Sequence, residues 1–225
     1  MSHFDPAMAL LRFLGFFIAL TMHEAGKAIV AKRLGDKSLE TSSRATLNPM
    51  AHIDLFGTII MPAFLIFMGV PYVFGWAKRL EISSRYFNKI KRDINIAYSS
   101  GTVINFIIAL SCVIGIKLSS NFGNDPFLGL TLLFQHKITT LSNMDVINVL
   151  LYTVAVSNIV IGLINLLPFI GSAGWYLLMN NLKYDWTLKL QKHATLIHYA
   201  TLFLLLFGFF NKIFNLIISL FFLIV

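Results

Sequence analysis

The stretch VINVLLYTVAVSNIVIGLINLL, residues 146–167, decides the fold class of this chain. It contains no charged side chain, and a helix of roughly 20 apolar residues spans the hydrocarbon core of a bilayer. A second uncharged stretch, INIAYSSGTVINFIIALSCVIGI, occupies residues 94–116. An open-ended segment in a bilayer satisfies its own backbone hydrogen bonds only as a helix. Both stretches therefore predict membrane-spanning helices.

The composition supports a membrane protein. Of the 225 residues, 57% are hydrophobic and 12% are charged, whereas a soluble domain usually carries about 25% charged residues. The net charge of +8 lies in short loops between apolar blocks. This pattern is typical of cytoplasmic loops beside a lipid bilayer and forms no continuous basic stripe, so we expect no nucleic-acid partner. The single cysteine, Cys112, excludes an intrachain disulfide.

Three further apolar blocks cover residues 7–30, 55–74 and 199–225, the last interrupted by Lys212. Each is long enough to cross the hydrocarbon core as a helix. We therefore expect an all-α, polytopic transmembrane helix bundle with five or six membrane segments. It would form a single membrane domain over residues 1–225.

The block 55–74 differs from the others because glycine and proline interrupt it. The interrupting residues are Gly57, Pro62, Gly69 and Pro71. Clusters of Lys and Arg precede and follow this block, and one full crossing would place them on opposite faces, against the positive-inside tendency. We therefore expect a re-entrant hairpin with both basic loops cytoplasmic and the loop 118–145 on the other side.

Three ionisable residues, His23, Glu24 and Lys27, lie in the body of the first apolar block. Such groups cost roughly 2.5–3.5 kcal/mol each at mid-depth when charged and usually carry a function. The string HEAGK is one residue away from HExxH, in which two histidines bind zinc and the glutamate is the base. The simpler interpretation is a Glu–Lys pair near a helix end, with the lysine extending to the membrane surface.

Five ordered stretches carry a family resemblance over about two thirds of the chain. They are HEAGKAIVAKRLGD (23–36), LNPMAHIDLFGTIIMP (47–62), FGWAK (74–78), SGTVINFIIA (100–109) and NLLPFIGSAGW (165–175). From Thr21 to about Trp175 the chain resembles the site-2 protease family of intramembrane zinc metalloproteases, in its compact bacterial form. The resemblance implies a core at about 7–182, a further transmembrane segment at about 199–225, and a bacterial inner membrane location.

The resemblance also implies a zinc site that this sequence does not complete. His23 matches the first ligand and Glu24 the general base, but Lys27 stands at the second ligand and Ala173 at the third. A protonated lysine offers no lone pair, and an alanine methyl cannot coordinate. We therefore expect no bound cofactor, with zinc only if other side chains substitute. One hypothesis is that the Lys27 ammonium fills the place of the metal and compensates the charge of Glu24.

His52 and Asp54 are the possible substitute ligands, since the resemblance places their stretch near the same half of the membrane. The simpler interpretations are a loop histidine bonded to backbone and an Asp54 helix cap. Asn105 matches a family position near the substrate path, although hydrogen bonding between helices explains it equally well. For Asn165 we favour the structural role.

Three functions stay open from the sequence. The first is a catalytically inactive, site-2-protease-like protein that binds a transmembrane or membrane-near segment of a partner. The second is an active zinc-dependent intramembrane endopeptidase with Glu24 as general base and substitute ligands. The third is an ion or small-molecule pathway, suggested only by Glu24 and Lys27. Whether the protein is an enzyme thus depends on the metal.

Overall fold

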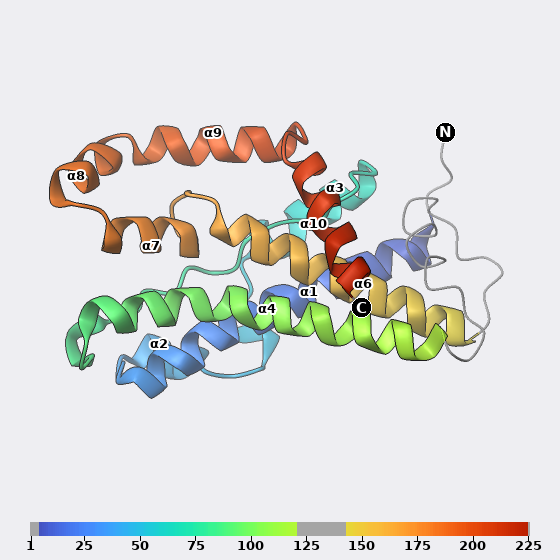
Figure 1. The fold of residues 1–225 in the computed structure, drawn as a ribbon, viewed down its shortest axis with the longest axis horizontal. Helices are drawn as coiled ribbons and strands as arrows, with labels where there is room; N and C mark the ends of the chain where they lie inside the picture. The colour runs from blue at the N-terminus through green and yellow to red at the C-terminus, as the bar shows by residue number, and fades with distance from the viewer. Residues whose placement is uncertain (1–4, 121–142, 225) are drawn as a thin grey trace.

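The computed structural model describes residues 5–120 and 143–224, and these ranges contain helices and no strand. Three long helices lie side by side in Figure 1: α1 (Pro6–Leu34), α4 (Ile90–Ser120) and α6 (Asn143–Leu166). Each is long and apolar enough to cross a bilayer. They confirm three of the predicted helices and support an integral membrane protein.

The ends of α1 follow from local sequence. The Asp5 carboxylate accepts a hydrogen bond from the Ala7 backbone N–H at 2.9 Å, and Pro6 occupies the first turn, where no N–H is needed. The helix stops at Gly35, whose φ of 117° lies in the left-handed region that glycine adopts without a steric penalty. These signals fix α1 as a helix of 29 residues.

A buried aspartate organises the chain just after α1. Asp36 accepts hydrogen bonds from the Ser38 N–H at 2.9 Å, the Thr41 hydroxyl at 2.6 Å and the Ser83 N–H at 2.9 Å. Burial acts to raise the pKa of Asp36, but these hydrogen bonds outweigh it and hold the pKa below its ordinary value. The carboxylate thereby ties the start of α2 (Leu39–Arg44) to the loop before η3 (Ser84–Tyr86).

The apolar block at 55–74 does not cross the structure as one long helix. It forms the π-helical η2 (Leu55–Ile60) and then α3 (Met61–Phe67), which together are too short to span a bilayer. The chain turns at Gly69, where φ is 69°, and returns in an extended conformation. The Trp76 N–H donates to the Gly57 carbonyl at 3.1 Å on the way back.

This hairpin brings its two ends together. The Lys78 N–H donates to the carbonyl of His52 at 3.0 Å, next to the 3₁₀ turn η1 (Pro49–Ala51). The basic residues before and after the hairpin therefore share one end of the molecule, as the hairpin prediction requires. That this end faces the cytoplasm stays a prediction.

The last apolar block is also broken. It consists of α9 (Ala194–Leu206) and α10 (Asn211–Ile224), which meet at an angle of 69° around Gly208. The described residues thus contain three spanning helices, or four if this bent pair counts as one span, and the predicted five or six are not confirmed. Residues 121–142 of the predicted loop 118–145 lie outside the described residues. Two short helices, α7 (Ala173–Asn181) and α8 (Tyr184–Lys192), connect α6 to α9.

Glycines let the long helices approach closely. A Cβ at Gly101 of α4 would lie 2.7 Å from the His23 carbonyl oxygen and 2.8 Å from its Nε2. Gly26 of α1 leaves room in the same way for the Ile104 side chain. Small residues at such crossings are typical of membrane helix pairs. This crossing holds the backbone and ring of His23 directly against α4.

Candidate functional site

The ionisable residues of α1 face the interior of the bundle. His23 is fully buried, while Glu24 and Lys27 are 7% and 4% exposed. Lys27 Nζ lies 2.7 Å from Glu24 Oε1, an ion pair between residues three apart on one helix face. The second carboxylate oxygen, Oε2, is buried and has no hydrogen-bond partner among the described residues. Glu24 is therefore neutralised by a side chain of its own helix.

The His23 ring is enclosed by α4. It packs on Gly101, and the Asn105 amide and the Gly101 backbone lie close enough to act on it electrostatically. Neither ring nitrogen, however, meets the geometry of a hydrogen bond with a described residue. The Asn105 amide group instead reaches the Asn158 carbonyl of α6 at 3.5 Å. The structure thus brings His23, Glu24, Lys27 and Asn105 together.

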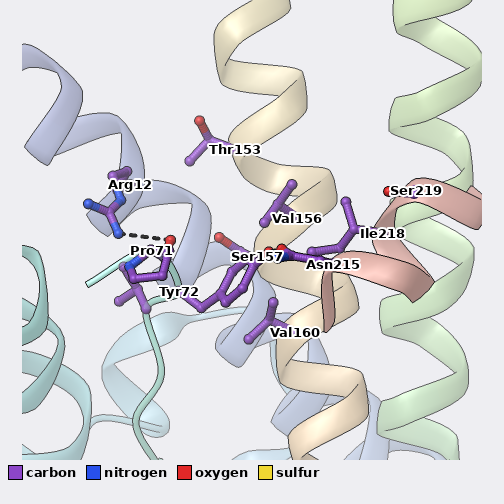
Figure 2. Close-up of a pocket in the computed structure, with 11 residues that line it drawn as sticks. Arg12, Pro71, Tyr72, Thr153, Val156, Ser157, Val160, Asn215, Ile218 and Ser219 are labelled. Atoms are coloured by element: carbon purple, nitrogen blue, oxygen red, sulfur yellow. Dashed lines mark hydrogen bonds between the residues drawn. The ribbon is translucent and has the colours of Figure 1, made fainter. Parts of the chain in front are cut away.

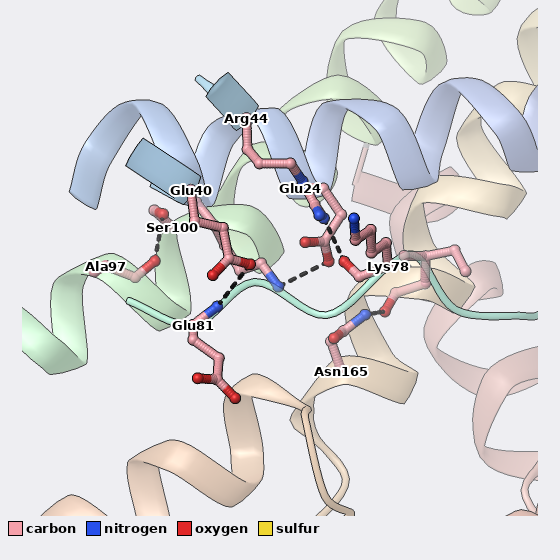
Figure 3. Close-up of polar contacts among 10 residues, drawn as sticks. Glu24, Glu40, Arg44, Lys78, Glu81, Ala97, Ser100 and Asn165 are labelled. Atoms are coloured by element: carbon pink, nitrogen blue, oxygen red, sulfur yellow. Dashed lines mark hydrogen bonds and ion pairs between the residues drawn. The ribbon is translucent and has the colours of Figure 1, made fainter. Parts of the chain in front are cut away.

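Two residues from the loops complete the polar cluster. Arg44 donates through Nη2 to the Lys78 carbonyl, while its buried Nε and Nη1 find no partner in the described part of the chain. Figure 3 shows the Arg44 guanidinium beside the Glu24 carboxylate. His52 is 2% exposed, and its Nε2 lies 3.0 Å from the Thr46 carbonyl oxygen. Burial lowers the pKa of His52, which favours a neutral ring.

The other predicted residues serve local structure. The Asp54 carboxylate accepts a hydrogen bond from the Gly57 N–H at 2.7 Å at the start of η2, which confirms the helix-cap interpretation. Asn165 donates to the Ile161 carbonyl at 3.0 Å within α6, and this bond within one helix is not the bond between helices that its structural role predicted. Ala173 is buried at the first position of α7.

A cavity of about 440 Å³ lies beside the ion pair. Glu24 and Lys27 form part of its wall, together with the returning arm of the hairpin (74–80), the loop after α6 and one face of α9. Most of the lining is apolar, but Lys78 and Arg79 are exposed cations on it. Asn105 is not among the lining residues, so its predicted contact with a bound segment stays a prediction.

The donor set does not fit a zinc ion. Among residues 5–120 and 143–224, no group of three His, Cys, Asp or Glu side chains is placed to hold a metal. Three protein ligands are the usual minimum for a catalytic zinc. The side chain that HExxH would supply as the second ligand is an ammonium already paired with Glu24. No catalytic step through a metal follows from these residues.

A comparison with curated proteins finds one informative likeness. Over 92 residues the chain is 36% identical to "Putative zinc metalloprotease YwhC" from Bacillus subtilis (strain 168). The match covers 41% of this chain and only 38% of that protein. No family model matches the chain, and no solved structure matches it. The likeness and the apolar helices together support a membrane metalloprotease-like protein.

Sequence reasoning missed two buried arginines. Arg44 and Arg12 are 4% and 5% exposed. Arg12 had a signal, since it is a lone charge inside an apolar block. Arg44 had none, because it lies in a polar loop where an exposed arginine is the ordinary case.

Proposed function

We propose that this chain is a catalytically inactive, site-2-protease-like membrane protein. It binds a transmembrane or membrane-near segment of a partner protein without cleaving it, in the cytoplasmic membrane of a bacterium. The 2.7 Å ion pair between Lys27 and Glu24 carries this proposal. It supports the proposal because Lys27 stands where the family resemblance implies a zinc ligand, and its ammonium pairs with the residue matched to the general base.

The charges explain why such a replacement is stable. A carboxylate buried among apolar helices needs a nearby cation or proton. In a zinc enzyme the metal supplies positive charge beside the general base, and here Lys27 does so from one turn away. Arg44 adds a second positive charge on the loop side. A divalent cation entering this cluster would meet two fixed positive charges and too few lone pairs.

The cavity supports the binding part of the proposal. Its apolar wall, formed by residues such as Phe74, Ile164 and Leu202, suits the side chains of a hydrophobic segment. Lys78 and Arg79 lie where an acidic residue flanking such a segment would be attracted. Trp76, which is 42% exposed on the cavity wall, offers a large surface for contact.

The metal content of the purified full chain tests the inactive state. The chain is incubated with zinc, and the excess is removed. Inductively coupled plasma mass spectrometry should then find far less than one zinc per chain. The variant His23→Ala should give the same value as the wild type. One zinc per chain that disappears in His23→Ala would overturn the proposal.

Site-specific photo-crosslinking tests the binding. A crosslinking amino acid at Trp76 should capture a membrane protein at its full, uncleaved mass. The same probe at Leu110, which is 40% exposed on α4 away from the cavity, is the matched control. Equal capture at both positions, or capture of cleaved fragments only, would count against an intact partner in the cavity.

The second candidate is an active zinc-dependent endopeptidase, which the name of the Bacillus subtilis relative favours. His23 and His52 both retain buried ring nitrogens that no described residue hydrogen-bonds. They are the donors that a substitute site would use beside Glu24. The zinc measurement separates the two candidates, since only the enzyme needs a metal in the purified chain.

A further inference from the structure

A second cavity lies at the opposite end of α1 from the Glu24–Lys27 pair. Its volume is about 220 Å³, and Figure 2 shows the residues around it. Arg12 lines this cavity and lies 15 residues before Lys27, which corresponds to about 22 Å along a helix. The two sites therefore belong to different halves of the spanning bundle, and this inference does not depend on the proposed function.

The cavity contains a positive charge that no acidic residue of the described ranges offsets. Arg12 is 5% exposed, and a guanidinium does not lose its proton in a protein. The ion pairs of the described residues are Lys27–Glu24 and Arg92–Asp93, so Arg12 has no carboxylate partner within those ranges. A buried charge at membrane depth is costly unless another group compensates it.

The hairpin accepts hydrogen bonds from only one nitrogen of the Arg12 guanidinium. Arg12 Nη2 donates to the carbonyl of Val70 and, at 3.1 Å, to the carbonyl of Pro71, as Figure 2 shows for Pro71. No acceptor among residues 5–120 and 143–224 takes a hydrogen bond from Nε or Nη1. These carbonyl contacts hold the guanidinium in place, but no carboxylate in residues 5–120 or 143–224 pairs with its charge.

The wall of the cavity offers further donors. Ser157 comes from α6 and Ser219 from α10, and neither hydroxyl has a hydrogen bond within the described ranges. The Tyr72 hydroxyl donates to Asn215 Oδ1, which leaves the NH₂ group of Asn215 free to donate to a ligand. A fixed cation surrounded by hydroxyl and amide donors is the arrangement that binds an oxyanion.

We propose that this cavity binds the phosphate group of an anionic phospholipid. Apart from Thr153, whose hydroxyl donates to the Val149 carbonyl, the remaining wall is apolar and suits the glycerol and upper acyl carbons of a lipid; it includes Val73, Val156, Val160 and Ile218. The side chains of Asn215 and Ser219 are exposed on α10, so the cavity is reached from the outer surface of the bundle. Basic pockets between transmembrane helices are a known form of anionic-lipid site.

The charge of the pocket selects the headgroup. Phosphatidylglycerol brings one negative charge and compensates Arg12. Phosphatidylcholine brings a quaternary ammonium as well, for which this cavity has no acidic partner among the described residues. We therefore expect the first lipid to bind at least about tenfold more tightly, which corresponds to one charge-assisted interaction. Inorganic phosphate is the other source of the same group, and it lacks contacts to the apolar wall.

Native mass spectrometry of the purified full chain in detergent tests the proposal, with phosphatidylglycerol, phosphatidylcholine or inorganic phosphate added separately. Wild type should retain one phosphatidylglycerol, and Arg12→Gln should bind this lipid at least about tenfold more weakly. Arg33→Gln, an exposed arginine at the other end of α1, is the matched control and should bind like wild type. Equal binding by wild type and Arg12→Gln, or binding of inorganic phosphate without phosphatidylglycerol, would overturn it.

A second variant covers the case in which Arg12→Gln does not fold. Val156→Phe fills the cavity from α6 and leaves the contacts of Arg12 with the hairpin in place. It should melt close to the wild-type temperature and lose the tightly bound phosphatidylglycerol. A folded Val156→Phe that holds the lipid with wild-type affinity would refute the site.

Discussion

Replacing Lys27 by methionine tests the central ion pair most directly. The change keeps the length and apolar stem of the side chain but removes the ammonium that lies 2.7 Å from Glu24. Both side chains are less than one tenth exposed, so removing the ammonium leaves the Glu24 carboxylate largely shielded from bulk water. Breaking a buried pair by removing one partner costs about 3–5 kcal/mol. For a chain of this size that corresponds to a melting temperature lower by about 6–20 °C.

The assay is thermal unfolding in detergent at neutral pH, followed by tryptophan fluorescence. Lys32→Met, an exposed lysine on the same helix, is the matched control and should melt within about 2 °C of wild type, as surface substitutions do. If Lys27→Met also melts within that range, the ion pair contributes nothing and the account of the site is wrong.

The double variant Glu24→Gln/Lys27→Met adds a second check. It removes both charges, and a neutral pair of similar volume is often tolerated in place of a buried ion pair. The double variant should therefore recover most of the stability that Lys27→Met loses. A coupling energy of at least about 2 kcal/mol is expected from the four melting curves, within the usual range for residues in direct contact. Additive effects would show that the two side chains do not act as a pair.

Three further predictions concern the metal positions, the helix crossing and the loop. The double variant Lys27→His/Ala173→Asp should bind about one zinc per chain where wild type binds none, and no gain would refute the assigned ligand positions. Gly101→Ala should lower the free energy of unfolding by about 1–3 kcal/mol because its Cβ would lie 2.7 Å from the His23 carbonyl oxygen. Gly115→Ala, whose Cβ has its nearest neighbour at 3.6 Å, should melt at or above the wild-type temperature. If Gly115→Ala is less stable than Gly101→Ala, the crossing of α1 and α4 at Gly101 is refuted. Asp36→Ala should lower stability by about 2 kcal/mol at pH 7, since it removes three hydrogen bonds to a carboxylate. The pKa of Asp36 is lowered in the folded chain, so its contribution is present above about pH 4 and is lost as the pH falls through the folded value. Thermal melts between pH 7 and pH 3 should show the stability difference between wild type and Asp36→Ala becoming smaller toward pH 3.

The sequence predicted the three long helices because hydropathy alone carries that information. A run of about 20 apolar residues has one favourable solution in a bilayer, whatever its neighbours do. Local chemistry likewise predicted the Asp54 cap, since a cap needs only its own first turn. The polar cluster of α1 also followed from spacing, because residues three and four apart share one helix face.

Glycine and proline predicted that the block 55–74 is interrupted, but only the tertiary structure decided at which residues the two remaining apolar blocks turn. The hairpin turns at Gly69 and closes through hydrogen bonds between residues about twenty or more positions apart, such as that between Lys78 and His52. The bend of 69° near Gly208 is equally invisible to hydropathy, because both halves are apolar. An apolar count of the sequence therefore does not separate a full crossing from a broken segment.

The same holds for the partners of the charged side chains. Sequence spacing could pair Lys27 with Glu24, but it could not bring Arg44 to their side or leave Arg12 beside a cavity without an acid. The positions of these charges depend on which helices cross at their glycines and on where the hairpin packs against α1. Electrostatic energy depends on distance in space, and separation along the chain fixes that distance only within one helix.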